Sequence, residues 1–112
     1  MNVGDLAWVD FPPGAGRAQA GRRPAIIAQT AAASDRLPTV LLIPLTTQQD
    51  ALRFPGTVLV EPDQSNGLRH LSVALVFQLT AVDRRFLGSR FGSISHTNME
   101  AIWSAFQEIT GR

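Results

Sequence analysis

The sequence predicts a mainly β protein, in which a small antiparallel barrel of short strands is followed by one C-terminal α-helix. Five short apolar stretches are rich in branched or aromatic residues and bounded by turn formers, as is typical of strands. No helix-length segment separates most of them, and this spacing favours an antiparallel barrel over a parallel α/β sheet. The predicted strands are Leu6–Phe11, Ala25–Ala28, Val40–Leu45, Thr57–Val60 and Val73–Leu79.

The last segment has a helical pattern, because its apolar residues recur at three- and four-residue steps and form one stripe. The stripe consists of Met99, Ile102, Trp103, Phe106 and Ile109. Two starts are available: Ser95 can cap the helix, or Thr97 can form a capping box with Glu100. Gly111 supplies the stop. We expect the stripe to pack across the barrel or at a dimer seam.

The composition indicates one globular domain over residues 1–112. The chain has 112 residues, 45% of them hydrophobic and 17% charged, which is too apolar for intrinsic disorder. It has no cysteine, which excludes a disulfide framework or a thiolate zinc site. The longest apolar run is far shorter than a membrane span, and Asp5 stands where a secretory signal carries basic residues. We therefore expect a cytoplasmic protein with no membrane association.

The cations are all arginine. The ten basic residues oppose nine acidic ones, so a net charge of +1 does not by itself indicate nucleic-acid binding. Arginine's planar fork pairs with phosphate oxygens better than an ammonium does. Compositional drift in a GC-rich genome would give the same bias, so the two interpretations stay open.

Two places in the chain offer groups for an anion. Arg22-Arg23-Pro24 joins a soft loop, Pro12–Gly21, to the second strand, and the proline restricts Arg23 to an extended backbone. At the end of the third strand, Thr46, Thr47 and Gln48 introduce hydroxyl and amide groups, which can bind phosphate without adding charge. Solvated surface arginines and ordinary strand-end threonines are the alternatives to a binding site.

Other familiar sites are missing from the sequence. It has no metal-ligand spacing, no glycine-rich loop ending in lysine and no nucleophile elbow around a serine. Two imidazoles can cleave RNA as acid and base, but His70 follows a turn and His96 lies at the helix start, so we expect both at the surface. We predict no metal site and no cofactor.

Four motifs, taken in order, resemble the MazF/PemK family of toxin endoribonucleases. They are Gly4–Phe11, Gln19–Pro24, Pro44–Gln48 and Ser72–Gln78. Asp83–Gly88 and the closing helix are also similar to that family, so the likeness covers essentially the whole chain. No single motif is specific, whereas four in the right order and spacing are.

The resemblance implies an SH3-like barrel of the CcdB/PemK type, paired as a homodimer and silenced by a cognate antitoxin. It also implies metal-independent, sequence-specific cleavage of single-stranded RNA such as mRNA, with Arg23 and Thr46 acting on the scissile phosphate. The 2′-hydroxyl would attack that phosphate and leave 2′,3′-cyclic phosphate and 5′-hydroxyl ends. We expect further RNA contacts from the loop Pro12–Gly21 with the adjoining arginines, from a second long loop, Thr47–Gly56, and from the fifth strand, namely Arg17, Gln19, Arg22, Thr47, Gln48 and Gln78.

Two positions depart from the family pattern. Ala18 and Phe77 stand where relatives often carry acidic residues with proposed acid/base roles. Three hypotheses follow: an active RNA endonuclease, a weak or inactive relative that still binds RNA or antitoxin, and a toxin of the same fold that acts on gyrase. Thr110-Gly111-Arg112 offers no exposed aromatic contact of the kind that gyrase-poisoning relatives use.

Overall fold

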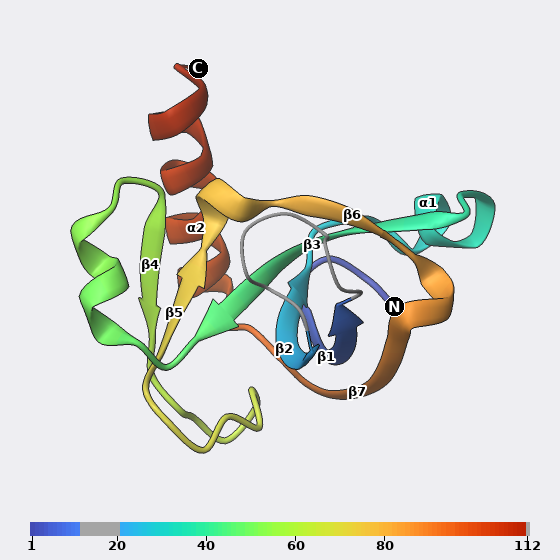
Figure 1. Ribbon diagram of the computed structural model, residues 1–112, viewed down its shortest axis with the longest axis horizontal. Helices are drawn as coiled ribbons and strands as arrows, with labels where there is room; N and C mark the ends of the chain where they lie inside the picture. Colours follow the sequence, from blue (N-terminus) through green and yellow to red (C-terminus); the bar gives the residue numbers. More distant parts are fainter. Residues whose placement is uncertain (12–20, 112) are drawn as a thin grey trace.

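The computed structural model describes residues 1–11 and 21–111. They form seven strands, two α-helices and three short 3-10 helices (Figure 1). The strands are β1 (Asp5–Phe11), β2 (Gly21–Ile27), β3 (Thr39–Thr46), β4 (Thr57–Val60), β5 (Ser72–Leu75), β6 (Thr80–Asp83) and β7 (Leu87–Ser93). The helices are α1 (Ala31–Arg36) and α2 (His96–Thr110), and the 3-10 helices are η1 (Gln49–Arg53), η2 (Val76–Gln78) and η3 (Arg84–Phe86).

The seven strands make one antiparallel sheet that curls around β3. The strand order is β4-β5-β3-β2-β1-β7. β6 lies outside this path: it pairs with the first half of β3, along the same edge on which β5 pairs with the last two residues of β3. Within the described residues β4 and β7 are not paired, so the sheet curls without closing into a hydrogen-bonded barrel. The predicted mainly β fold with a C-terminal helix is confirmed.

Both faces of the sheet are buried, because successive side chains of a strand point to opposite sides. One core lies between the sheet and α2, which packs against β4 (Figure 1), and includes Leu6, Ile43 and Ile102. The second core lies on the other face and consists of Val9, Phe11, Ala25, Leu42 and Val82. Burial on both faces explains why the strands read as short, nearly continuous apolar runs.

The predicted fifth strand is wrong beyond Leu75. The chain turns there into η2, where Leu79 N–H donates to the Val76 carbonyl and Phe77 N–H donates to the Gly56 carbonyl. The chain must change direction at this point to reach the other end of β3, because β5 pairs with the last residues of β3 whereas β6 pairs with its first half. The alternation that we expected through Gln78 therefore stops.

Three elements were not predicted. α1 is a six-residue helix whose start is capped by Thr30, with its hydroxyl oxygen accepting from Ala33 N–H at 3.2 Å. β6 is a short continuation after η2, and β7 is a polar, glycine-containing strand that pairs with β1 through two register shifts. Only α1 carried a usable local signal, a threonine directly before an alanine run.

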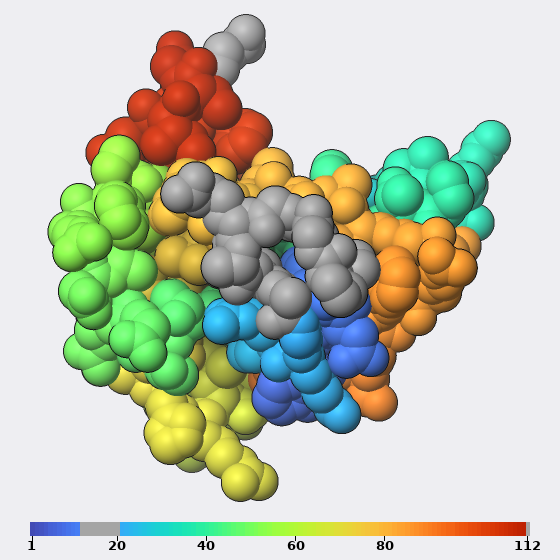
Figure 2. Space-filling model, in the orientation of Figure 1, coloured from blue at the N-terminus to red at the C-terminus, as the bar shows by residue number. Residues whose placement is uncertain are grey.

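The segment between β4 and β5 folds around Asn66, which is fully buried. Its Oδ1 accepts from Asp63 N–H and Leu68 N–H, and its amide nitrogen donates to the Glu61 carbonyl. Gly67 follows with a φ of +67°, where a Cβ would lie 2.6 Å from a backbone oxygen of β7. The segment, yellow in Figure 2, projects at the lower edge of that view. The Asn66-Gly67 pair thus forms a turn and also fixes the segment between β4 and β5 against β7.

α2 begins and ends where the sequence predicts. Ser95 is the N-cap, with its hydroxyl oxygen accepting from Asn98 N–H at 3.1 Å, and Gly111 ends the helix in the left-handed region. Met99 and Ile102 are buried, Trp103 and Phe106 pack partly against the first core, and Ile109 remains exposed. Within the part of the chain that the structure describes, no helix is long and apolar enough to cross a membrane.

Replacing the cap tests this helix start. Ser95→Ala should lower the free energy of unfolding by about 1 kcal/mol, because the Asn98 N–H loses its acceptor. Urea denaturation measures the change, with Ser104→Ala on the exposed side of α2 as the control that loses no cap. Equal stability of the Ser95→Ala variant and the wild type would assign the start of α2 to packing alone.

Candidate active site

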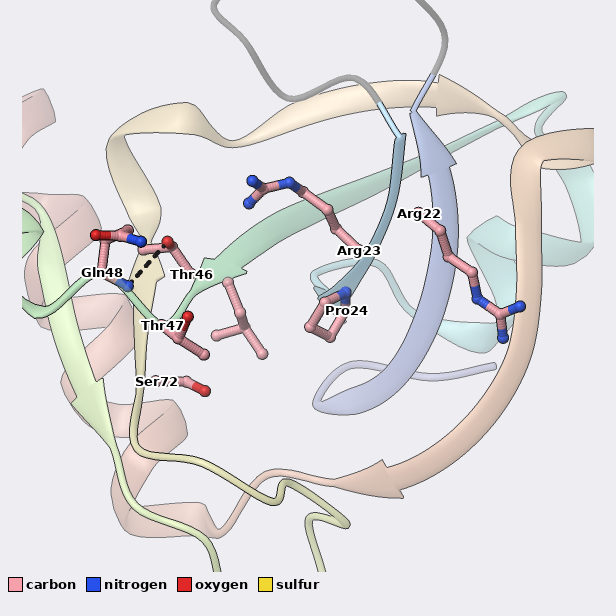
Figure 3. Close-up of a pocket in the computed structure, with 8 residues that line it drawn as sticks. Arg22, Arg23, Pro24, Thr46, Thr47, Gln48 and Ser72 are labelled. Carbon is pink, nitrogen blue, oxygen red and sulfur yellow. Dashed lines mark hydrogen bonds between the residues drawn. The ribbon is translucent and has the colours of Figure 1, made fainter.

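A pocket of about 260 Å³ opens between the start of β2 and the end of β3 (Figure 3). The two strands pair as far as Ala25 and Pro44 and are not paired beyond that point. Pro24 and Pro44 supply no N–H donors, which weakens the ladder where it ends. The lining consists of Arg22, Arg23, Pro24, Leu45, Thr46, Thr47, Gln48 and Ser72.

The register brings Arg23 and Thr46 to the same pocket. Ala25 and Pro44 are partners, and Arg23 and Thr46 each lie two residues further along their diverging strands, on the same face. In Figure 3 the Arg23 side chain extends from β2 toward the end of β3, where Thr46 lies. Both residues are half-buried. Two groups distant in the sequence therefore line one cavity.

Arg22 points away from Arg23, because neighbouring residues of a strand face opposite sides. Its guanidinium lies over the Trp8 ring, 4.9 Å from the ring centroid, and Figure 3 shows it directed toward β7. Arg22 thus borders the pocket without sharing the direction of Arg23. The two arginines of the Arg-Arg-Pro motif have different surroundings.

Hydrogen bonding leaves the Thr46 hydroxyl able to donate. The Thr46 Oγ1 accepts from Gln48 N–H at 3.1 Å, which fixes the oxygen and leaves the hydroxyl proton available. The Ser72 hydroxyl is used differently, because it donates to the His70 carbonyl at 3.0 Å. Thr47 and Gln48 are exposed at the rim. Thr46 is the hydroxyl best prepared to contact an anion in this pocket.

The lining is electropositive. It contains two arginines and, among the described residues, no aspartate or glutamate. The charged turn at Asp83–Arg85 does not contribute, since Asp83 and Arg85 pair with each other at 3.8 Å on the surface. An anion entering the pocket meets uncompensated positive charge, with hydroxyl and amide donors opposite.

Of the residues expected to bind RNA, the described residue Gln78 does not line this pocket. Arg17 and Gln19 lie outside the described residues. Gln78 lies in η2 and not in the lining, because the chain leaves the strand at Val76. Its Oε1 is buried and has no hydrogen-bond partner within residues 1–11 and 21–111. The prediction for Gln78 rested on the alternation of side chains along a strand, and the turn into η2 interrupts that alternation.

Both histidines are exposed, as expected. His96 lies 3.4 Å from Glu100 on the first turn of α2. His70 borders a second cavity beside the pocket. Among the described residues, no group of three or more histidine, aspartate or glutamate side chains is arranged to hold a metal ion.

Sequence reasoning missed two lining residues, Leu45 and Ser72. Leu45 is buried beneath the pocket as the last core residue of β3 before Thr46, and Ser72 begins β5 beside it. Only the pairing of β3 with β5 brings Ser72 here. No local signal marks a serine that becomes a neighbour of Thr46 from 26 positions further along the chain.

Comparison with known proteins agrees with this fold. The chain is 29% identical over 111 residues to the endoribonuclease toxin MazF of Escherichia coli K12, covering 98% of this chain and 94% of that protein. The crystal structure of MazF from Deinococcus radiodurans superposes with a TM-score of 0.83 at 24% identity, covering 100% of this chain and 97% of that one. A MazE-MazF structure from the same organism gives a TM-score of 0.78 at 23% identity, covering 99% and 96%.

The family comparison covers almost all of the chain. Residues 2–110 match the family described as PemK-like, MazF-like toxin of type II toxin-antitoxin system. The matched span includes the pocket between β2 and β3 and both of its central residues, Arg23 and Thr46. The chain therefore belongs to the PemK-like, MazF-like family of type II toxin–antitoxin toxins.

Proposed function

We propose that Arg23 and Thr46 carry the RNA-cleaving activity of this MazF-like toxin endoribonuclease. The observation that supports this is their meeting in one electropositive pocket from two different strands. Cleavage proceeds by attack of a ribose 2′-hydroxyl on the adjacent phosphate, with departure of the 5′-oxygen. The products are a 2′,3′-cyclic phosphate and a 5′-hydroxyl.

Each residue has one role. The Arg23 guanidinium stabilises the charge that develops on the phosphate oxygens in the transition state, and it cannot act as a free base near neutral pH. Thr46, whose oxygen is anchored by the Gln48 N–H, donates its hydroxyl proton to a phosphate oxygen and orients the group. Thr47 and Gln48 at the rim, with Arg17, Gln19 and Arg22, are assigned to RNA binding.

Removal of the 2′-hydroxyl proton and protonation of the leaving 5′-oxygen are both assigned to solvent water. The described lining has no carboxylate, and residues 12–20 contain no aspartate or glutamate in their sequence. Phe77, at the second position where relatives often carry an acid, is an exposed aromatic whose ring lies 5.7 Å from Phe54. This favours a slow enzyme that depends on charge stabilisation, with an inactive RNA-binding relative as the second candidate.

The decisive experiment is cleavage without metal. Purified full-length protein is incubated with long single-stranded RNA in EDTA, and the ends of the fragments are identified. We expect discrete fragments with cyclic phosphate and 5′-hydroxyl ends. RNA that is bound but left intact would favour the inactive relative, and fragments formed only after added metal would contradict the metal-independent mechanism.

An antitoxin partner follows from the charge of the pocket. The solved MazE-MazF structure of D. radiodurans pairs a relative with a second protein. We propose that the cognate antitoxin presents an acidic, disordered segment to the pocket, where Arg22 and Arg23 meet no described carboxylate. We also place the toxin in the cytoplasm, where its mRNA substrate is found.

The homodimer is assigned to an exposed apolar face. Leu52, Phe54, Phe77 and Ile109 are each 39–44% exposed. The rings of Phe54 and Phe77 are 5.7 Å apart, and Gly56 packs closely against both Phe77 and Ile109. Phe54 directly after η1, Phe77 of η2 and Ile109 of α2 thus form one surface, with Leu52 of η1 close by in the chain, that a second copy would cover.

Charge introduced on that face should separate the copies. Phe77→Asp is expected to change the mass in solution from twice the 12.1 kDa chain mass to the mass of one chain, as light scattering after gel filtration would measure. The matched control is Leu41→Asp, because Leu41 is equally exposed on β3 outside this face. A dimeric Phe77→Asp variant, or a monomeric control, would contradict this interface.

A further inference from the structure

A second cavity, of about 530 Å³, continues from the Arg23 pocket. Pro24, Thr47 and Ser72 line both cavities, so the two form one surface. The other residues of the second cavity are Trp8, Gly67, Leu68, Arg69, His70 and Phe91. Its volume falls in the range of about 300–1,000 Å³ that is typical of ligand pockets.

The walls of this cavity are aromatic and basic. Trp8 and Phe91 are half-buried, and their rings lie 5.2 Å apart at 37°. The Arg22 guanidinium lies over the Trp8 ring, 4.9 Å from the ring centroid. Arg69 contributes a further cation, and His70 contributes an imidazole that can hydrogen-bond.

The opposite wall is held in place before any ligand arrives. Asn66 ties the segment between β4 and β5 together, and Ser93 N–H of β7 donates to the Ser65 carbonyl at 2.9 Å. Gly67 packs so closely on Phe91 that a Cβ would lie 3.0 Å from its ring. A cavity whose wall is fixed in this way requires little ordering on binding.

We propose that this cavity is a subsite for one unpaired nucleobase of the RNA, beside the phosphate held by Arg23. Single-stranded RNA is recognised by stacking its bases on aromatic side chains and by hydrogen bonds to their edges. Trp8 and Phe91 provide the stacking surface, and Arg69 and His70 provide edge contacts. The occupant is a base because the cavity opens onto the phosphate pocket and presents two aromatic rings beside Arg69. The inference rests on the proposed RNA cleavage.

Binding of uncleavable strands tests the subsite apart from cleavage. The probes are fluorescein-labelled 2′-O-methyl dodecamers of uridine, adenosine and cytidine, and an abasic dodecamer with the same number of phosphates. Fluorescence anisotropy gives the dissociation constants. For the wild type, at least one base-bearing strand should bind more tightly than the abasic strand.

Trp8→Leu and Phe91→Leu should each weaken binding of that base-bearing strand by about 5- to 150-fold. Binding of the abasic strand should stay within about twofold, because the phosphate contacts remain. Arg23→Ala should weaken both kinds of strand equally. Trp8→Phe, which keeps an aromatic ring, should retain most of the base-dependent affinity and shows that the fold is intact.

Trp103→Phe is the matched control, because Trp103 is the other tryptophan and lies on α2, away from the cavity. In that background Trp8 is the only tryptophan, and its emission should change with the base-bearing strand and not with the abasic one. Equal effects of Trp8→Leu on the base-bearing and abasic oligonucleotides, or no effect on either, would overturn the proposal. A protein segment would then be the remaining candidate for the occupant of the cavity.

The two proposals fail differently. Wild-type protein that cleaves RNA in EDTA but binds base-bearing and abasic strands alike would overturn the subsite alone. Wild-type protein that shows base-dependent binding lost in Trp8→Leu, yet cleaves nothing, would overturn the proposed cleavage alone.

Discussion

Replacing Arg23 by alanine should lower the rate of RNA cleavage by about 10²- to 10³-fold, the effect typical of removing one preorganised donor from a transition-state anion site. The guanidinium extends into a pocket without a described carboxylate, so no other charge there compensates for its loss, and Arg22 is directed at Trp8. Initial rates on one RNA, with the protein in excess, measure the change.

The control variants distinguish the effect of the position of Arg23 from the effect of losing one positive charge. Arg36→Ala removes the same charge from the last turn of α1, an exposed site outside the pocket, and should leave the rate within about twofold. Thr46→Val should also slow cleavage, whereas Thr46→Ser keeps the hydroxyl and should retain most of the rate. Cleavage by Arg23→Ala at the wild-type rate would remove the guanidinium from the mechanism.

Replacing Asn66 by alanine should lower the free energy of unfolding by about 2–4 kcal/mol. The substitution leaves the Asp63 and Leu68 N–H groups and the Glu61 carbonyl without their partner, and each buried polar group left unpaired typically costs about 1–3 kcal/mol. Water reaching this exposed segment limits the sum. Urea denaturation at constant pH measures the difference.

Neighbouring variants make the Asn66 result specific. Ser65→Ala should change the free energy of unfolding by less than about 0.5 kcal/mol, because Ser65 is exposed and its backbone carbonyl still accepts from Ser93 N–H. Asn66→Asp keeps an acceptor but loses the donor to Glu61, and should fall between the two. A stability of Asn66→Ala equal to that of Ser65→Ala would mean that backbone contacts alone hold the segment.

Trp8 shows what a local sequence pattern can predict and what it cannot. The first strand was predicted from its apolar run, and the alternation along it puts Val9 in the second core and Trp8 on the opposite side. The sequence gives no reason to expect a cavity beside Trp8. That cavity exists because Phe91 of β7 and the Asn66 segment, both distant in the chain, lie against the same face.

Local sequence patterns were sufficient to predict the features that depend on near neighbours in the chain. These are the first four strands to within four residues, the α2 stripe with its Ser95 cap and Gly111 stop, and the extended backbone at Arg23 before Pro24. Strand alternation, capping and proline geometry act over a few residues, so their signals survive in a single sequence.

Which of these elements meet depends on long-range packing, and no local pattern predicted it. β3 pairs with three strands, and that arrangement diverts Gln78 into a turn, brings Ser72 beside Thr46 and lets β2 and β3 part at Arg23. Strand partners are chosen by burial of two sheet faces across the whole chain, and no short stretch of residues encodes that choice.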